Sequence, residues 1–221
     1  MLLKEERIPN QIDDIKKFFA GVDDAKIVIE SSSAWYHIYE YLSKHHHVVL
    51  SNPVKTKAIA SVRVKTDHLD AFTLADLLRG GYIAESYMPP GRIMDLREIV
   101  RHRAGLVGIR TSLKNKIHGH LLMQGIKIED EPFSKAYVDK LRMIHNYKMG
   151  GYLNVIDALN HEIDHVSRQI MLEAKDDEYT RLLMSISGIG HYLALLIVSR
   201  IGEIERFPDS QHLCSYAGLT P

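Results

Sequence analysis

The sequence lacks the features that mark secreted and membrane proteins. It has a single cysteine, Cys214, which excludes an internal disulfide and fits a reducing compartment. No apolar run approaches the roughly 20 residues that a membrane-spanning helix needs. The first 19 residues are charged throughout, without the apolar core of a signal peptide. We therefore expect a cytoplasmic protein.

The chain also lacks net charge, because 28 basic side chains balance 28 acidic ones among its 221 residues. The charges are unevenly distributed. Residues 53–127 carry 13 basic and 6 acidic side chains, whereas residues 128–180 carry 6 basic and 11 acidic ones. Phosphate contacts supply most non-specific affinity for nucleic acids. The basic block therefore predicts a nucleic-acid surface that the neutral total conceals.

The N-terminal part reads as strand, helix and strand. A short helix is expected over residues 11–20, with apolar side chains on one face. Residues 26–31 and 47–50 are short and β-branched, as buried strands are, and a helix containing Trp35 and Leu42 lies between them. This order predicts a sheet with flanking helices.

Beyond residue 54 the pattern is helical. Thr66 is a plausible N-cap for a helix over residues 67–79, which Gly80 and Gly81 would end. Residues 93–124 carry apolar residues at spacings of seven and four, which is typical of a long helix packed along another helix. Residues 152–175 have the matching pattern and are the expected antiparallel partner.

Residues 181–221 read as a separate small unit. The segment Ser187-Gly188-Ile189-Gly190 lies between two apolar helical stretches, as in a helix-hairpin-helix. The backbone N–H groups of such a glycine turn can bind a DNA phosphate, which makes Gly188 and Gly190 candidate nucleic-acid contacts. An ordinary helical hairpin with a glycine turn is the alternative, and spacing alone does not choose between them.

Three carboxylates form the strongest candidate site. Glu30 sits at the end of a buried strand, and Asp67 and Asp70 share one face at the start of a helix. Hard oxygen ligands on rigid elements suit Mg²⁺, so we expect these carboxylates to lie roughly 4–8 Å apart around a shared ion. The alternative is that both aspartates only favour the positive end of their helix.

A run of basic residues without any Asp or Glu lies between Ile99 and Lys127. A solvated helix face normally mixes charges of both signs. We interpret the run as a surface for DNA or RNA, with a plain solvated face as the alternative. Its members are Arg101, Arg103, Arg110, Lys114, Lys116 and Lys127.

Several short motifs occur in a set order along the chain. The N-terminal motifs are Glu30-Ser31-Ser32-Ser33-Ala34-Trp35-Tyr36, Ser51-Asn52-Pro53 and Lys65-Thr66-Asp67-His68-Leu69-Asp70-Ala71. The C-terminal motifs are Ser187-Gly188-Ile189-Gly190, Ile201-Gly202-Glu203-Ile204, Arg206-Phe207 and Tyr216-Ala217-Gly218-Leu219-Thr220-Pro221. In these motifs and their order, over nearly its whole length, the chain resembles insertion-sequence transposases with a DEDD nuclease domain. This is a family of recombinases associated with a structured guide (bridge) RNA.

The resemblance implies an α/β plus all-α fold in three parts. Residues 1–90 would be a partial RNase H-like (RuvC-like) domain, residues 91–180 a long antiparallel helical coiled coil, and residues 181–221 the start of a helical C-terminal transposase domain. Glu30, Asp67 and Asp70 would be the second, third and fourth acids of the DEDD set and would bind Mg²⁺. DNA, a guide RNA and further copies of the chain would be the partners.

Two departures from the family pattern concern the ends of the chain. The family's first Asp lies on an opening strand before the helix matched by residues 11–20, and its catalytic serine follows the Gly-Leu-x-Pro element. We expect a chain truncated at both ends that does not complete strand exchange alone. A non-catalytic DNA- or RNA-binding remnant and a RuvC-like, Mg²⁺-dependent junction nuclease using three acids are the alternatives.

Overall fold

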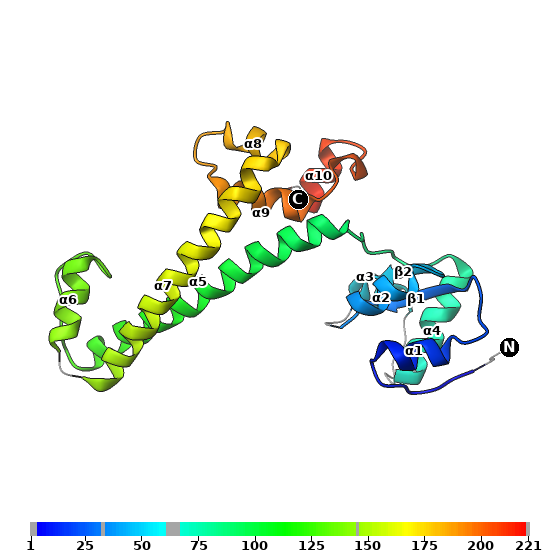
Figure 1. The fold of residues 1–221 in the computed structure, drawn as a ribbon, viewed down its shortest axis with the longest axis horizontal. Coiled ribbons are helices and arrows are strands. Elements are labelled where there is room, and N and C mark those ends of the chain that lie inside the picture. Colours follow the sequence, from blue (N-terminus) through cyan, green and yellow to red (C-terminus); the bar gives the residue numbers. More distant parts are fainter. Residues whose placement is uncertain (1–3, 32–33, 61–66, 145, 220–221) are drawn as a thin grey trace. The chain divides into compact units, whose positions relative to one another are not determined.

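The computed structural model describes residues 4–31, 34–60, 67–144 and 146–219, with the backbone alone at residues 57–60 and 67–70. Within these ranges the chain is mostly helical and has one small parallel sheet (Figure 1). It divides into two compact units, Met1–Met88 and Pro89–Pro221.

A two-stranded parallel sheet is the centre of the first unit. Strands β1 (Lys26–Glu30) and β2 (His47–Ser51) pair from Lys26 opposite His47 to Glu30 opposite Ser51. Helix α2 (Tyr36–Leu42) lies between them in the chain, as a parallel pair requires a crossover. The predicted order of strand, helix and strand is therefore confirmed.

Three further helices complete this unit: α1 (Ile12–Phe18), α3 (Pro53–Ala60) and α4 (Asp67–Gly80). Helix α1 contacts α2, and α4 contacts β1. Among the side chains of this unit that the structure describes, the buried apolar ones are Ile15, Leu42, Val49 and Leu50. Helix α4 ends before Gly81, which has a φ of +74° that glycine adopts without strain.

Two long helices form the framework of the second unit. They are α5 (Gly91–Met123) and α7 (Tyr147–Asp176), and both helices expected from the sequence are present. The Arg103 Nε donates to the Ser167 Oγ over 2.8 Å, and the Arg110 guanidinium donates to the Asn160 Oδ1 over 2.8 Å. The residue number rises from 103 to 110 along α5 while that of the partner falls from 167 to 160 along α7. The two helices are therefore antiparallel (Figure 1).

Separate apolar clusters stabilise the two ends of this pair. At one end, α6 (Lys135–Met143) adds buried Tyr137 and Leu141 to buried residues of α5 and α7. At the other end, α9 (His191–Ile201) adds Leu195. The sequence interpretation missed α6, although Ser134 marks its start by accepting a hydrogen bond from the Tyr137 N–H.

Short elements complete the C-terminal part: α8 (Glu178–Met184), the 3-10 helix η1 (Ile204–Arg206) and α10 (Ser210–Tyr216). The last carbonyl groups of α9 receive side-chain donors from neighbouring elements. Arg97 of α5 donates to the Ser199 carbonyl, Tyr216 to the Arg200 carbonyl and Arg206 to the Ile201 carbonyl. These bonds attach the end of α9 to α5 and α10.

A cavity in the cluster at the α6 end is expected to destabilise the second unit. Leu153 of α7 is 0% exposed, whereas Val155 is 48% exposed. Leu153→Ala should lower the free energy of unfolding by about 2–5 kcal/mol, because a buried leucine is replaced by a void. Val155→Ala is the control and should change it by roughly 0.5 kcal/mol or less. Hydrogen exchange of α5 and α7 peptides measures both, and equal effects would contradict this packing.

Candidate functional site

Glu30 is the predicted metal ligand whose side chain the structure describes. It is the last residue of β1, it is half-buried, and its strand partner is Ser51 of β2. The hydrogen bonds of the sheet hold the backbone of Glu30 in place. Its role as a metal ligand stays a prediction.

The Ser51 side chain lies beside this strand end and was not singled out as a site residue. It is 0% exposed, and its Oγ has no hydrogen-bond partner among the described residues. Asn52, next in the chain, accepts hydrogen bonds from the backbone N–H groups of Val54 and Lys55 at the start of α3. A buried hydroxyl without a partner is unusual in proteins. The Ser-Asn-Pro motif was the signal that pointed to this position.

Asp67 and Asp70 occupy the first turn of α4, and α4 contacts β1, the strand that ends at Glu30. Their side chains, and Thr66, the expected cap of this helix, lie outside the described residues. Among the side chains that are described, no three His, Cys, Asp or Glu residues are grouped to hold a metal ion. Convergence of the three acids therefore stays a prediction.

The basic residues of α5 divide into two sets. Arg101 and Lys116 are exposed, as is Lys127 beyond the end of the helix. Arg103 and Arg110 are half-buried and donate to side chains of α7. This division could not be predicted from the sequence, because it depends on which face of α5 meets α7.

Aromatic rings account for further contacts of these cations. The Arg103 guanidinium lies 4.3 Å from the centroid of the Tyr192 ring, and the Lys114 ammonium lies 4.5 Å from that of Phe133. Burial, and after it the charge of Arg110, lowers the pKa of Lys114 from its ordinary value. These cations therefore support the packing of the helices, whether or not they also bind phosphate.

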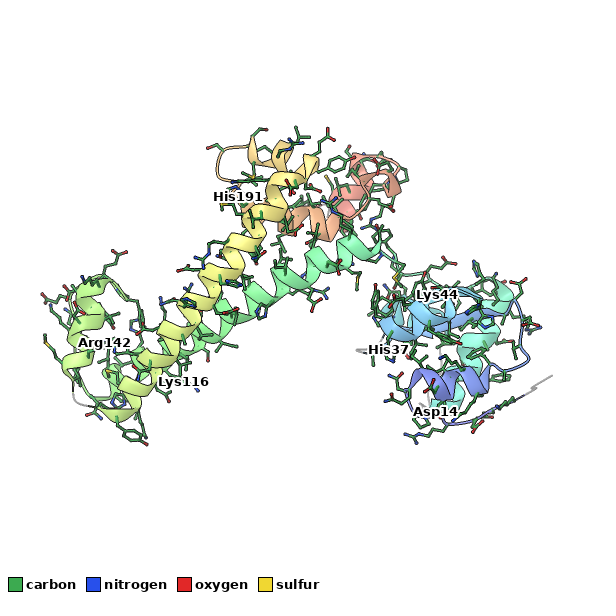
Figure 2. The ribbon with its side chains drawn as sticks, in the orientation of Figure 1. Asp14, His37, Lys44, Lys116, Arg142 and His191 are labelled. Carbon is green, nitrogen blue, oxygen red and sulfur yellow. The ribbon has the colours of Figure 1, made fainter. Side chains whose placement is uncertain are left out.

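The glycine turn joins α8 to α9. Gly188 has a φ of +90°, and Gly190 precedes the first residue of α9, His191 (Figure 2). A groove of about 420 Å³ adjoins the turn and is lined by Gly190, His191, Tyr192 and Arg103, among others. The first N–H groups of a helix have no partners within it, so a phosphate here would meet N–H donors and a guanidinium. Binding at Gly188 and Gly190 stays a prediction.

No described helix is both long enough and apolar enough to cross a membrane.

Family models match both ends of the chain. A model of IS110-type DEDD transposases, described as "Transposase", matches residues 1–124. A second model, described as "Transposase IS116/IS110/IS902 family", matches residues 180–221. The two matches lie in the order that the motifs indicated.

Three relatives agree with the family models. The y4qE protein of Sinorhizobium fredii (strain NBRC 101917 / NGR234), provisionally named a transposase, is 22% identical over 94% of this chain and 53% of its own length. The transposase for insertion sequence element IS1111A of Coxiella burnetii (strain RSA 493 / Nine Mile phase I) is 28% identical over 58% of this chain and 37% of its own. The transposase for insertion sequence element IS1328 of Yersinia enterocolitica is 23% identical over 94% of this chain and 64% of its own.

The chain thus spans about half the length of the relatives that it matches. The first family model covers more than half of the chain, and the second covers its C-terminal part. This chain therefore belongs to the IS110-type DEDD transposases.

Proposed function

We propose that this chain acts in the transposition of an insertion sequence, as part of a DNA recombinase in the cytoplasm. The observation that carries the proposal is the pair of family matches, which cover residues 1–124 and 180–221 in one chain. The first unit would be the RNase H-like part, the α5–α7 pair the coiled coil, and the elements from α8 to α10 the transposase domain. In the intact enzyme, further copies of the chain and a guide RNA would complete the assembly.

Glu30, Asp67 and Asp70 would hold Mg²⁺ in this recombinase. The ion, when bound, supplies positive charge that stabilises the oxygens of a phosphate under attack. The chain's own contribution is the placement of carboxylates, with Glu30 fixed by its strand. The buried Ser51 hydroxyl next to that strand end is a further oxygen that a hydrated ion can satisfy.

Substitution of the three acids tests the metal site. Glu30→Gln, Asp67→Asn and Asp70→Asn should each weaken binding of Mg²⁺, or of the spectroscopic substitute Mn²⁺, by roughly tenfold or more, because an amide lacks the carboxylate's charge. Titration calorimetry and Mn²⁺ electron paramagnetic resonance measure the affinity.

Asp76→Asn is the matched control for this metal site. Asp76 lies on α4 as Asp67 does, but it is exposed and pairs with Arg79 over 2.7 Å. If Asp67→Asn bound Mn²⁺ as tightly as Asp76→Asn does, Asp67 would not be a ligand.

The exposed cations of α5 would bind the phosphates of the nucleic acid. Arg101→Gln and Lys116→Gln should each reduce the slope of log affinity against log salt by about 1, since each removes one phosphate contact. The free energy of unfolding should not change, because both side chains are exposed. Fluorescence anisotropy at a series of salt concentrations measures the slope.

Arg103→Gln is the contrasting variant, because Arg103 is half-buried whereas Arg101 and Lys116 are exposed. It removes the hydrogen bond to Ser167 and the contact with Tyr192, so the second unit should lose about 1 kcal/mol of stability. If Arg101→Gln and Lys116→Gln both left the slope of log affinity against log salt unchanged, the exposed face of α5 would be a solvated face that does not bind nucleic acid.

A further inference from the structure

A groove with a volume of about 390 Å³ lies between α5 and α7, at the end of the pair that α6 covers. Ile117 and Met149 are buried residues that line the groove, and they are 1% and 2% exposed. The volume lies in the lower part of the range for small-ligand sites. Both long helices contribute to the groove, so their packing fixes its shape.

The ionisable residues that line this groove carry positive charge or none. They are Lys116 of α5, Lys148 of α7 and His120 of α5, and no Asp or Glu is among the described residues lining it. Both lysines are exposed, so their ammonium groups can reach an anion in the groove. A groove lined by cations and no acids favours an anionic ligand.

Asn146 orients the side chain of His120. The Asn146 Oδ1 accepts the backbone N–H groups of Lys148 and Met149, over 3.1 and 3.2 Å, and thereby caps α7. Its amide nitrogen is therefore the atom that lies 3.1 Å from the His120 Nε2, and that nitrogen can only donate. The His120 Nε2 is the acceptor in this contact, which orients the imidazole in the groove.

The remaining wall of the groove is apolar and aromatic. Tyr152 of α7 is half-buried, and the Lys116 ammonium lies 5.9 Å from the centroid of its ring (Figure 2 labels Lys116). Met123 is 84% exposed, and a Cβ added at Gly119 would meet no atom within 4 Å. Cations beside an aromatic ring are the combination that binds a nucleotide, the phosphate at the cations and the base on the ring.

We propose that this groove binds one unpaired nucleotide of a nucleic-acid strand, with its phosphate at Lys116 and Lys148 and its base against Tyr152. The base must be unpaired, because bases in a duplex are stacked on each other and cannot reach a side-chain ring. The inference rests on the proposed nucleic-acid function and adds a position and a strand type to it. RNA and DNA share this chemistry, so both are used as probes.

Filling the groove tests the proposal without weakening the fold. Gly119→Leu projects a side chain into the groove from an open helical position, where leucine is also the better helix former. The probes are fluorescent oligouridine, oligothymidine and a DNA duplex of the same length, with binding followed by anisotropy. Gly119→Leu should weaken single-strand binding roughly fivefold or more, the effect of losing one stacked base, and leave duplex binding unchanged.

Gly108→Leu is the matched control, because Gly108 is an equally open position of the same helix outside the groove. It should not alter the ratio of single-strand to duplex affinity. Tyr152→Leu keeps apolar packing, removes the ring and should weaken single-strand binding as Gly119→Leu does. Lys148→Gln should lower the single-strand salt slope by about 0.7, and exposed Lys135→Gln, on α6, should not.

Three outcomes would overturn the proposal. If Gly119→Leu and Lys148→Gln behaved as Gly108→Leu and Lys135→Gln do, while the chain still bound nucleic acid, the groove would not be the site and the proposed function would stand. If single-strand and duplex affinity fell equally in Gly119→Leu, the groove would contact only the backbone. If the unaltered chain bound none of the probes, both the groove and the proposed nucleic-acid function would be rejected.

Tighter binding of oligouridine than oligothymidine would assign the site to RNA.

Discussion

Apolar packing between α5 and α7 holds together the second unit of this protein. Leu153 and Ile170 of α7 are almost fully buried, one in each of the two apolar clusters along the pair. Burying side chains of this size contributes about 1.5–3 kcal/mol each, which offsets the entropy of ordering two long helices. Helix α6 completes one cluster and α9 completes the other. The packing of α5 against α7 therefore also positions the Lys116–Lys148 groove at one end of the helix pair and the glycine turn at the other end.

The same contact determines what the basic residues of α5 can do. Arg103 and Arg110 lie at the margin of the interface, where they donate to Ser167 and Asn160 of α7. Arg101 and Lys116 face solvent and keep their charges available for phosphate. The half-buried cations of this segment therefore contribute to packing, and the exposed ones are those that we propose bind phosphate.

The elements with a strong local signal could be predicted from the sequence. Spacing of apolar residues predicted the long helices, and short β-branched runs predicted the parallel strands, because both depend on local periodicity. Helix α6 was missed, since its stability depends on Tyr137 and Leu141 meeting α5 and α7. The packing contact of Arg103 and the place of Tyr152 and Lys148 in one groove could not be predicted either, because they depend on residues distant in sequence. The place of Glu30 at the end of its strand could be predicted from local sequence, and its role as a metal ligand stays a prediction.

We propose that Glu30, Asp67 and Asp70 form one metal site in a DNA recombinase. A crystal structure of the chain soaked with Mn²⁺, with anomalous scattering recorded, tests this most directly. We expect an anomalous peak with carboxylate oxygens of all three residues at roughly 2.0–2.6 Å, the range for hard cations. An ordered Asp67 pointing away from Glu30, with no peak between them, would contradict the claim.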